Sequence, residues 1–181
     1  MSIKDNLLAS IIIVNFNNAK YINQCINSIK KQNYKQKEII FVDDKSKDNS
    51  VQLMSKFKNI KYIKTKSKTK YGSYNQMNAY YEGFLASKGD IIFFLDSDDF
   101  FVKNKLKKII NIFVKNKKTK IIFDHPICIR GQKKIKKKIN QKFFLLSSWP
   151  RFTPQSCISM RRKYFYDLFK ISFIKKFPDV W

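Results

Sequence analysis

Residues 91–99 read IIFFLDSDD, five consecutive apolar residues followed by three acids in four positions. An uninterrupted apolar run of this length is typical of a strand that is buried on both faces of a parallel sheet. Two other apolar runs also end in polar residues. The run at residues 10–16 has Asn15 and Asn17 at its end, and the run at residues 38–42 is followed by Asp43 and Asp44. Ligands of such sheets bind outside the carboxyl ends of the strands. The sequence therefore predicts that these polar residues meet at one rim.

Helical periodicity alternates with the predicted strands. Apolar residues at i, i+3, i+4 and i+7 from Ile22 predict a first helix that opens near Asn17 or Asn18 as its cap. Further helices are predicted at residues 51–57, 74–86, 106–114 and 164–169, and further strands at residues 61–64, 120–123 and 156–160. This alternation favours an α/β, Rossmann-like, mostly parallel sheet that is flanked by helices on both faces.

Length and composition narrow the function classes. The 181 residues are expected to form a single domain, and 44% hydrophobic residues with 15% aromatics exclude wholesale disorder. The formal charge of +25 comes almost entirely from Lys, because Arg occurs at only four positions. Nucleic-acid binders more often use Arg, and a coding sequence rich in A and T favours Lys whatever the function, so charge alone does not choose among anionic partners. We expect no nucleic-acid partner. A Lys-rich surface nevertheless attracts any polyanion.

Cysteine usage and the N-terminal apolar run bear on the compartment. Three Cys and a single His are too few and too scattered for a zinc site or a disulfide framework, which favours a reducing, cytoplasmic compartment. The apolar residues 7–14 are preceded by Asp5 and lack a cleavage site, and they are shorter than the ~20 residues that span a bilayer. Peripheral contact of the Lys-rich surface with the inner membrane face stays open.

The acids after the strand at residues 91–95 have a spacing that suits a divalent cation. Asp96 and Asp98 are separated by one residue, so in an extended chain both side chains point the same way. Two such carboxylates repel each other unless they share a cation, and oxygen ligands of this kind suit Mg²⁺ or Mn²⁺. The alternative is a solvated turn in which the acids cap the helix that follows.

A second polar cluster covers residues 43–50. A carboxylate here can accept hydrogen bonds from the N–H of a base or from a ribose hydroxyl, while Ser46 and Asp48 suit turns and helix caps. We interpret Asp48 as structural and Asp44 as a ligand contact. In the alternative interpretation all of these residues serve the turn and the cap.

Taken together, these stretches resemble glycosyltransferase family 2, whose members have the GT-A fold. The resemblance lies in residues 10–17, 39–50 and 88–99, with Asn78 and Gly83 between them, and their order and spacing fit across residues 9–100. Beyond residue 100 it is looser, although residues 156–162 look like the later strand and turn of the family. Val14 stands where the family often has Pro.

The resemblance implies a nucleoside diphosphate sugar donor, with a UDP-sugar favoured, and Mg²⁺ or Mn²⁺ as cofactor. Phe16 would lie against the base, Asp44 would accept from the N–H of its ring, Asp96 would approach the ribose and diphosphate, and Asp98, together with Asp96, would hold the metal. Lys68 or Lys70 would meet the diphosphate. The full set of implied nucleotide-sugar contacts is Val14, Asn15, Phe16, Asn17, Asp43, Asp44, Asp96 and Ser97.

The second half of the chain is harder to interpret. By the same resemblance residues 1–124 form the nucleotide-sugar-binding half, and residues 125–181 begin an acceptor half that we expect to be incomplete. The family's catalytic base is an Asp or Glu of that half, and Asp179 is the candidate here; the alternatives are an ordinary surface Asp179 and a base beyond Trp181. Residues 149–155 form either part of an acceptor wall or a plain core and loop, His125 is interpreted as structural, and residues 133–138 as a solvated hairpin or loop.

The favoured function is a metal-dependent transfer of sugar, with inversion, to a hydroxyl acceptor in surface glycan biosynthesis. The acceptor would be a glycan or a lipid-linked saccharide. A nucleotidyltransferase is an alternative, although that class calls for a Gly-rich loop after the first strand, and residues 15–20 contain no Gly. A non-enzymatic basic module that binds nucleic acid or a membrane surface is another, and it predicts steep salt dependence without a role for Asp98.

Overall fold

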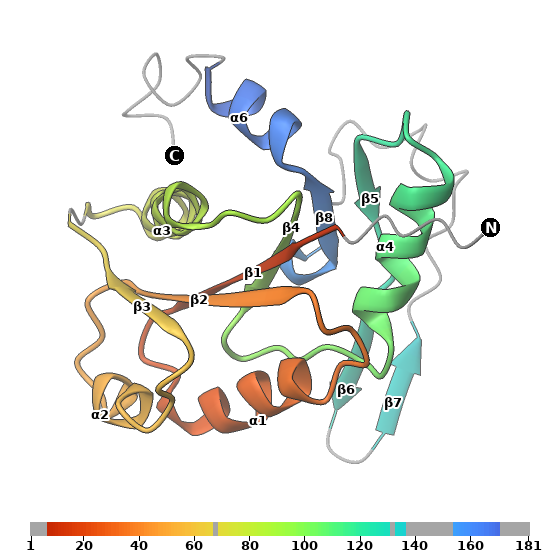
Figure 1. Ribbon diagram of the computed structural model, residues 1–181. Coiled ribbons are helices and arrows are strands. Elements are labelled where there is room, and N and C mark those ends of the chain that lie inside the picture. The colour runs from red at the N-terminus through yellow and green to blue at the C-terminus, as the bar shows by residue number, and fades with distance from the viewer. Residues whose placement is uncertain (1–6, 67–68, 131–132, 137–153, 171–181) are drawn as a thin grey trace, which may run out of the picture.

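The computed structural model describes residues 7–66, 69–130, 133–136 and 154–170 (Figure 1). Its main sheet has six strands in the order β3-β2-β1-β4-β8-β5, and two further strands pair as β6-β7. The strands are β1 (Ala9–Asn15), β2 (Lys37–Asp43), β3 (Lys61–Lys64), β4 (Ile91–Asp96), β5 (Ile121–Phe123), β6 (Ile127–Arg130), β7 (Lys133–Lys136) and β8 (Ile158–Arg161). The helices are α1 (Ala19–Lys30), α2 (Ser50–Met54), α3 (Gly72–Ala86), α4 (Lys105–Lys115) and α6 (Arg162–Lys170), with a 3-10 turn at Gln155–Cys157.

The register brings three strand ends to one level. β1 pairs in parallel with β2 and with β4, so that Asn15 lies opposite Asp43 and Val14 lies opposite Asp96. β3 extends this parallel part, whereas β8 is antiparallel to both β4 and β5. The predicted mostly parallel α/β sheet is confirmed.

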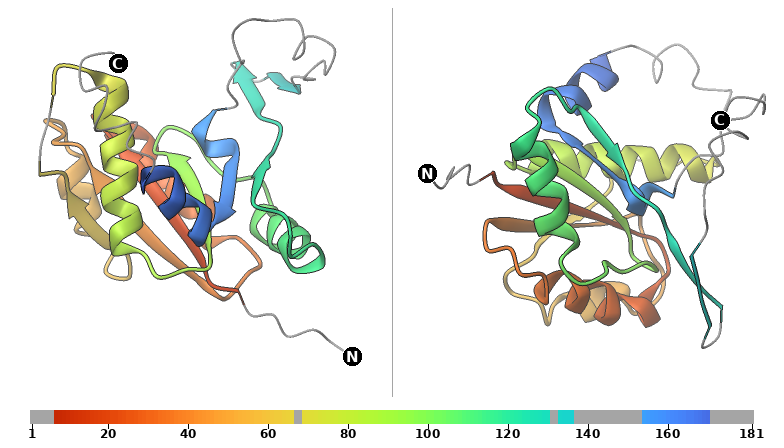
Figure 2. Two further views of the ribbon diagram at one scale, coloured as in Figure 1. Left: turned by 90° about the horizontal axis from the view of Figure 1, so that it is seen from above. Right: turned by 90° about the vertical axis from the view of Figure 1, so that its right-hand side faces the viewer.

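Helices cover both faces of the sheet, as the sequence predicts (Figure 2). One face packs against α1, α2 and α4 through a cluster that includes Ile11, Ile26 and Phe113. The other face packs against α3 and α6 through Ile12, Tyr80 and Phe165. Alternate residues of β1 therefore serve opposite layers, which explains why its apolar run is uninterrupted.

Helix α3 approaches the sheet closely at Gly83. A Cβ atom there would lie 2.4 Å from Cγ2 of Ile12 and 2.9 Å from Cγ2 of Val42. Only a residue without a side chain fits such a contact. The close approach brings the same helix within reach of the carboxyl end of β4.

The segment after β5 contains the hairpin that residues 133–138 predict, with β6 and β7 antiparallel and Ile127 opposite Lys136. Lys137 and Lys138 lie outside the described residues. His125 is exposed. Within the described ranges, none of the helices combines the length and the apolar character that a bilayer crossing requires. The division of the chain at residue 124 stays a prediction.

Candidate functional site

The carboxyl ends of β1, β2 and β4 form one rim, as predicted. Backbone hydrogen bonds tie the three ends together: the amide of Asp44 donates to the carbonyl of Asn15 at 2.8 Å, and the amide of Ser97 donates to that of Val14 at 3.0 Å. Asp44 and Asp98 therefore follow strands that both neighbour β1, at the same edge of the sheet.

Side chains join the loop after β1 to the loop after β2. The Asn15 amide donates to Oδ1 of Asp43 and to Oγ of Ser46, both at 3.0 Å. The Ser46 hydroxyl also accepts from the amide of Asn17 at 2.9 Å, and Oδ1 of Asn17 accepts from the amide of Lys47 at 2.8 Å. Asn17 and Lys45 have φ values of 54° and 56°, and the bonds of its amide and its side chain hold Asn17 in this conformation. The rim is thus held together by hydrogen bonds of Asn15, Asn17 and Asp43.

Asp48 has the structural role that was predicted for it, and α1 has its N-cap at Asn18, one of the two predicted positions. Asn18 occupies the cap position, but its side chain makes no cap bond and donates instead to Oγ of Ser97 at 3.3 Å. Oδ2 of Asp48 accepts from the amide of Ala19 at 2.8 Å, and its Oδ1 accepts from the amide of Ser50 at 3.1 Å. Burial raises the pKa of Asp48, but the hydrogen bonds from Ser50 and Ala19 outweigh it and leave the pKa below its usual value. One carboxylate therefore serves the starts of two helices.

Asp44 is buried at the rim and shares a hydrogen bond with the end of β3. The Thr65 hydroxyl donates to Oδ1 of Asp44 at 2.9 Å, and the Thr65 amide donates to the carbonyl of Asp43 at 3.0 Å. Asp44 and Thr65 are 5% and 3% exposed. Oδ2 of Asp44 accepts no hydrogen bond from any residue that the structure describes. One carboxylate oxygen is thus committed and the other is available.

Asp96 is held by helix α3. Its Oδ1 accepts from the hydroxyl of Tyr80 at 2.7 Å and from the amide of Gln76 at 2.8 Å. Burial raises the pKa of Asp96; the bonds from Tyr80 and Gln76 oppose that rise, the negative charges of Asp99 and Asp98 add to it, and the net pKa lies above its usual value. Oδ2 has no such donor among the described residues.

The structure differs from the sequence analysis in the path of the chain after Asp96. Strand β4 ends at Asp96, and the amide of Asp99 donates to the carbonyl of Asp96 at 2.9 Å, which closes a turn. The period of two therefore does not extend to Asp98, and the predicted extended path is wrong. Asp98 is exposed at the tip of this turn, and Phe16 is 46% exposed across the rim.

The residues of the turn fit a divalent cation that a substrate helps to bind. No group of three or more acid, His or Cys side chains in the described ranges is placed to hold a metal ion. Mg²⁺ in phosphate-transferring sites typically uses one or two carboxylates and completes its shell with water and substrate oxygens. The Asp98 carboxylate and Oδ2 of Asp96 offer that donor set.

The structure does not test several residues that were named from the sequence. Asp179, Lys68 and residues 149–153 lie outside the described residues. The ammonium of Lys70 lies 5.1 Å from the centre of the Tyr71 ring.

A family model described as "Glycosyl transferase family 2" matches residues 10–169. The chain belongs to glycosyltransferase family 2. An uncharacterized glycosyltransferase of Nostoc sp. is 36% identical over 104 residues, which cover 58% of this chain and 32% of that protein. The poly(ribitol-phosphate) β-N-acetylglucosaminyltransferase TarS of Staphylococcus aureus is 31% identical over 100 residues, covering 54% of this chain and 17% of TarS. The Escherichia coli β-1,3-glucosyltransferase WfgD is 32% identical over 114 residues, covering 62% and 43%.

Solved structures show the same GT-A fold. Residues 1–349 of S. aureus TarS in complex with UDP give a TM-score of 0.66 at 18% identity, covering 90% of this chain and 49% of that one. The mannosyltransferase PcManGT of Pyrobaculum calidifontis, in complex with GDP-Man and Mn²⁺, gives 0.61 at 13% identity, covering 90% and 46%. This family 2 chain spans less than half the length of the relatives named above.

Three rim residues escaped the sequence analysis: Thr65, Gln76 and Tyr80. Gln76 and Tyr80 are four residues apart on α3, so both face the same way, and polar groups on the buried side of a helix are a signal that was available. Thr65 directly follows a short strand, and its role depends on a partner 21 positions away in the chain. Nothing local to the sequence indicates that pairing.

Proposed function

We propose that this family 2 chain binds a nucleoside diphosphate sugar at the rim of β1, β2 and β4, with Mg²⁺ or Mn²⁺, and serves sugar transfer to a hydroxyl acceptor. The observation that carries the proposal is the position of Asp44 and Asp98 after two strands that flank β1. Each has at least one carboxylate oxygen that accepts no hydrogen bond from the residues that the structure describes. Phe16 directly follows β1 and is partly exposed, so its ring can supply an aromatic face for a base.

The hydrogen bond from Thr65 to Asp44 supports uracil as the base. Since Oδ1 of Asp44 already accepts from Thr65, only Oδ2 remains for the ligand. Uracil offers a single ring N–H between two carbonyl groups, which one oxygen satisfies. Guanine offers a ring N–H and an amino group side by side, and cytosine has no N–H on the corresponding ring nitrogen. A UDP-sugar is therefore the donor that we propose.

Asp98 and Oδ2 of Asp96 would hold the cation. When bound, Mg²⁺ or Mn²⁺ neutralises negative charge on the diphosphate as it departs. Tyr80 and Gln76 keep Oδ1 of Asp96 engaged, so the orientation of its other oxygen is fixed before a ligand arrives. The turn closed by the Asp99 amide presents Asp98 to solvent, where a diphosphate can reach it.

The transfer that we propose inverts the configuration of the sugar. The acceptor oxygen forms a bond to the sugar carbon as the bond from that carbon to the diphosphate oxygen breaks, and UDP leaves with the electron pair. A carboxylate of the acceptor half accepts the proton of the acceptor hydroxyl. Asp179 stays our candidate for that base, outside the described residues. The acceptor that we propose is a glycan or lipid-linked saccharide, and WfgD is named for transfer to a diphosphoundecaprenol-linked GlcNAc.

Ligand binding measured with and without the cation tests this proposal. Isothermal titration with UDP, GDP and CDP, each with and without Mn²⁺, is expected to show Mn²⁺-dependent binding that favours UDP. The ligand is also expected to raise the unfolding temperature. The free energy of unfolding should increase by about 2.7 kcal/mol at a ligand concentration a hundredfold above Kd.

Asp98→Asn is expected to abolish the Mn²⁺ dependence, because it removes the charge of the exposed carboxylate. Asp167→Asn is the matched control, since it removes an exposed acid from α6, remote from the rim. Binding that survives Asp98→Asn unchanged, or that requires a polynucleotide and no nucleoside diphosphate, would contradict the proposed function.

A further inference from the structure

Ser156 makes a hydrogen bond to the backbone of the metal-binding turn from the side opposite β1. Its Oγ accepts from the amide of Asp96 at 3.0 Å, and the residue is 7% exposed. The pairing of β4 with β8 covers only Ile91 to Phe93, so within the described ranges the last part of β4 has no strand neighbour on that side. Ser156 therefore supplies by side chain the bond that a longer β8 would supply by backbone.

Ser156 is itself held by a buried lysine. The ammonium of Lys105, at the start of α4, donates to the carbonyl of Ser156 at 2.8 Å. The same ammonium lies 2.8 Å from Oδ2 and 3.1 Å from Oδ1 of Asp124, the residue after β5, and 4.6 Å from the centre of the Phe101 ring. Lys105 is 9% exposed. One cation thus joins the ends of β5, the 3-10 turn and α4.

This ion pair is a costly way to stabilise a core. Removing two charges from water offsets most of their attraction, and apolar side chains of similar size often stabilise a fold as well. We therefore interpret the ion pair by the position in which it holds Ser156. The chain leaves β4 at Asp96, passes through the turn and begins α4 at Lys105. Lys105 therefore fixes the far end of the segment that starts at Asp96.

We propose that Ser156, fixed by the Lys105–Asp124 ion pair, is a positioning residue for the turn at Asp96–Asp98. The Ser156 hydroxyl holds the backbone of Asp96 against the rim, so that Asp98 is presented in the geometry that a cation and a diphosphate require. This inference rests on the proposed function and adds a second anchor to Asp96, whose carboxylate is already held from α3.

Ser156→Ala and Ser159→Ala form a matched pair for the test. Ser159 is fully buried in β8, and its Oγ has no hydrogen-bond partner among the residues that the structure describes, so its loss removes a hydroxyl without removing a bond to them. Mn²⁺ affinity would be measured by electron paramagnetic resonance, alone and with UDP, well below the unfolding temperature of each variant. Ser156→Ala is expected to weaken binding of Mn²⁺ with UDP about three- to tenfold, as the loss of one hydrogen bond does, while Ser159→Ala leaves it unchanged. Ser156→Thr, which keeps the hydroxyl, is expected to restore it.

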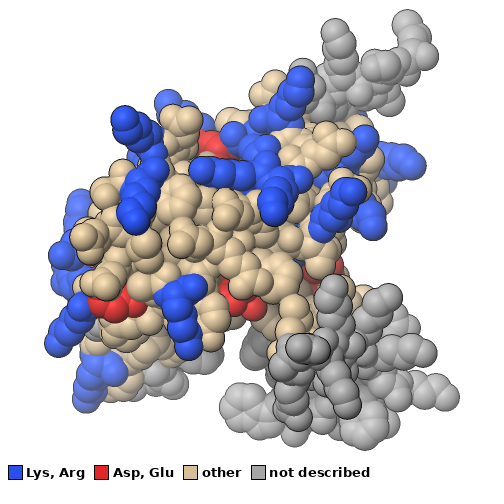
Figure 3. All heavy atoms as spheres, turned by 90° about the horizontal axis from the view of Figure 1, so that it is seen from below, with Lys and Arg blue, Asp and Glu red and all other residues tan. Residues whose placement is uncertain are grey.

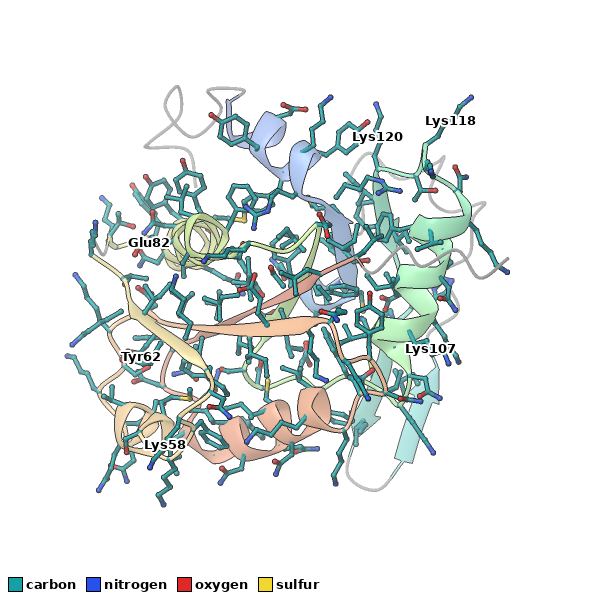
Figure 4. The ribbon with its side chains drawn as sticks, viewed as in Figure 1. Lys58, Tyr62, Glu82, Lys107, Lys118 and Lys120 are labelled. Atoms are coloured by element: carbon teal, nitrogen blue, oxygen red, sulfur yellow. The ribbon has the colours of Figure 1, made fainter. Side chains whose placement is uncertain are left out.

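A second variant tests the lysine without leaving a lone buried charge. Lys105→Met combined with Asp124→Leu removes both charges together, and Lys107→Met removes an exposed charge from the same helix (Figure 4). The double variant is expected to weaken Mn²⁺ binding with UDP as Ser156→Ala does, and Lys107→Met is not.

Two outcomes would overturn the inference in distinguishable ways. Equal Mn²⁺ affinities in Ser156→Ala and Ser159→Ala, with UDP still bound by both, would show that Ser156 serves the fold alone while the proposed function stands. An unaltered protein that binds neither Mn²⁺ nor UDP would overturn the proposed function, and the positioning role with it.

Discussion

Asp43 and Asp44 are neighbours in the chain, yet their carboxylates have different partners. Both oxygens of Asp43 accept hydrogen bonds from the rim itself, from the side chain of Asn15 and the amide of Ser46. Asp44 gives one oxygen to Thr65 and keeps the other. Only Asp44, the residue after β2, therefore keeps a carboxylate oxygen for a ligand.

Thr65→Val is expected to weaken UDP binding and to reduce its preference over GDP. The substitution removes the donor to Oδ1, so the Asp44 carboxylate becomes free to turn and to meet two donors at once. The affinity for UDP should fall about threefold to tenfold, the range for one lost hydrogen bond. Titration with both nucleotides in the presence of Mn²⁺ measures it.

Thr119→Val is the control for this change. The Thr119 hydroxyl makes no hydrogen bond within the described part of the chain, while the backbone of the residue serves Arg161. A UDP-to-GDP preference that is the same in Thr65→Val and in Thr119→Val would contradict the selection argued from Asp44.

Individual residues also show how far the sequence can be followed. Asp48 could be assigned to a cap because its partners Ala19 and Ser50 include one two residues away, whereas the pairing of Thr65 with Asp44 joins separate strands. The direction in which the chain presents Asp98 could not be predicted from the sequence, because it depends on the residue at which β4 ends and the turn begins. Local patterns predict a residue's role only when its partners are local.

At the scale of elements, the start of α1 is held by the loop that follows β2, although α1 itself follows β1. Asp48 accepts from the amide of Ala19, so the cap of α1 forms only when the β2 loop is in place. Asp48→Ala is expected to destabilise the fold by about 1 kcal/mol, as loss of a helix cap does. Urea unfolding at pH 7 measures the change.

The pH dependence of stability gives a further prediction for Asp48. Its folded-state pKa is lowered, so the contribution of its carboxylate is fully present above the unfolded pKa of about 3.9 and is lost as pH falls through the folded value. Unfolding free energy between pH 6 and pH 2.5 is therefore expected to fall less steeply in Asp48→Asn. Parallel curves for the two proteins would contradict this account.

Helix α3 offers a matched pair of glycines. Gly83→Ala is expected to destabilise the fold by about 1–3 kcal/mol, because the added carbon meets Ile12 and Val42 in a packed core. Gly72→Ala, at the exposed start of the same helix, meets no atom within 4 Å and should be neutral or stabilise by up to ~1 kcal/mol. Thermal unfolding of both variants measures the difference, and equal effects would contradict the close approach of α3.

At the level of elements the sequence predicts well. Uninterrupted apolar runs identify β1 and β4, and the stripe beginning at Ile22 identifies α1. Asn18 is the N-cap residue of α1, as predicted, but its side chain makes no cap bond and donates to Oγ of Ser97 instead. The hairpin β6-β7 could be predicted only as one of two options, since a Lys-rich run has no periodicity that requires strands.

The whole molecule carries its charge broadly. Lys and Arg side chains spread over the face seen in Figure 3, with few acids among them. Lys58 extends from the loop after α2, Lys107 from α4, and Lys118 and Lys120 from the loop between α4 and β5 (Figure 4). Such a surface attracts polyanions without regard to their sequence. The acids of the rim are placed within that positive field.

Salt separates these two kinds of binding. Binding of a polyanion such as heparin is expected to weaken more than tenfold between about 50 and 200 mM salt, and Asp98→Asn should leave it unchanged or slightly stronger. Binding of UDP with Mn²⁺ should depend on Asp98 at every salt concentration. Filter binding and titration across the salt series measure both, and equal dependence on Asp98 would refute the separation.

The double use of α3 links the core to the ligand. The helix that rests on the sheet at Gly83 is the one that grips Asp96 through Tyr80 and Gln76. A change that separates α3 from the sheet, whether by heat or by mutation, therefore also weakens the two hydrogen bonds that hold Asp96, the residue that we propose as a ligand of the cation. Donor release should thus precede global melting, and nucleotide should protect buried amides of α3 from solvent exchange more than those of α1.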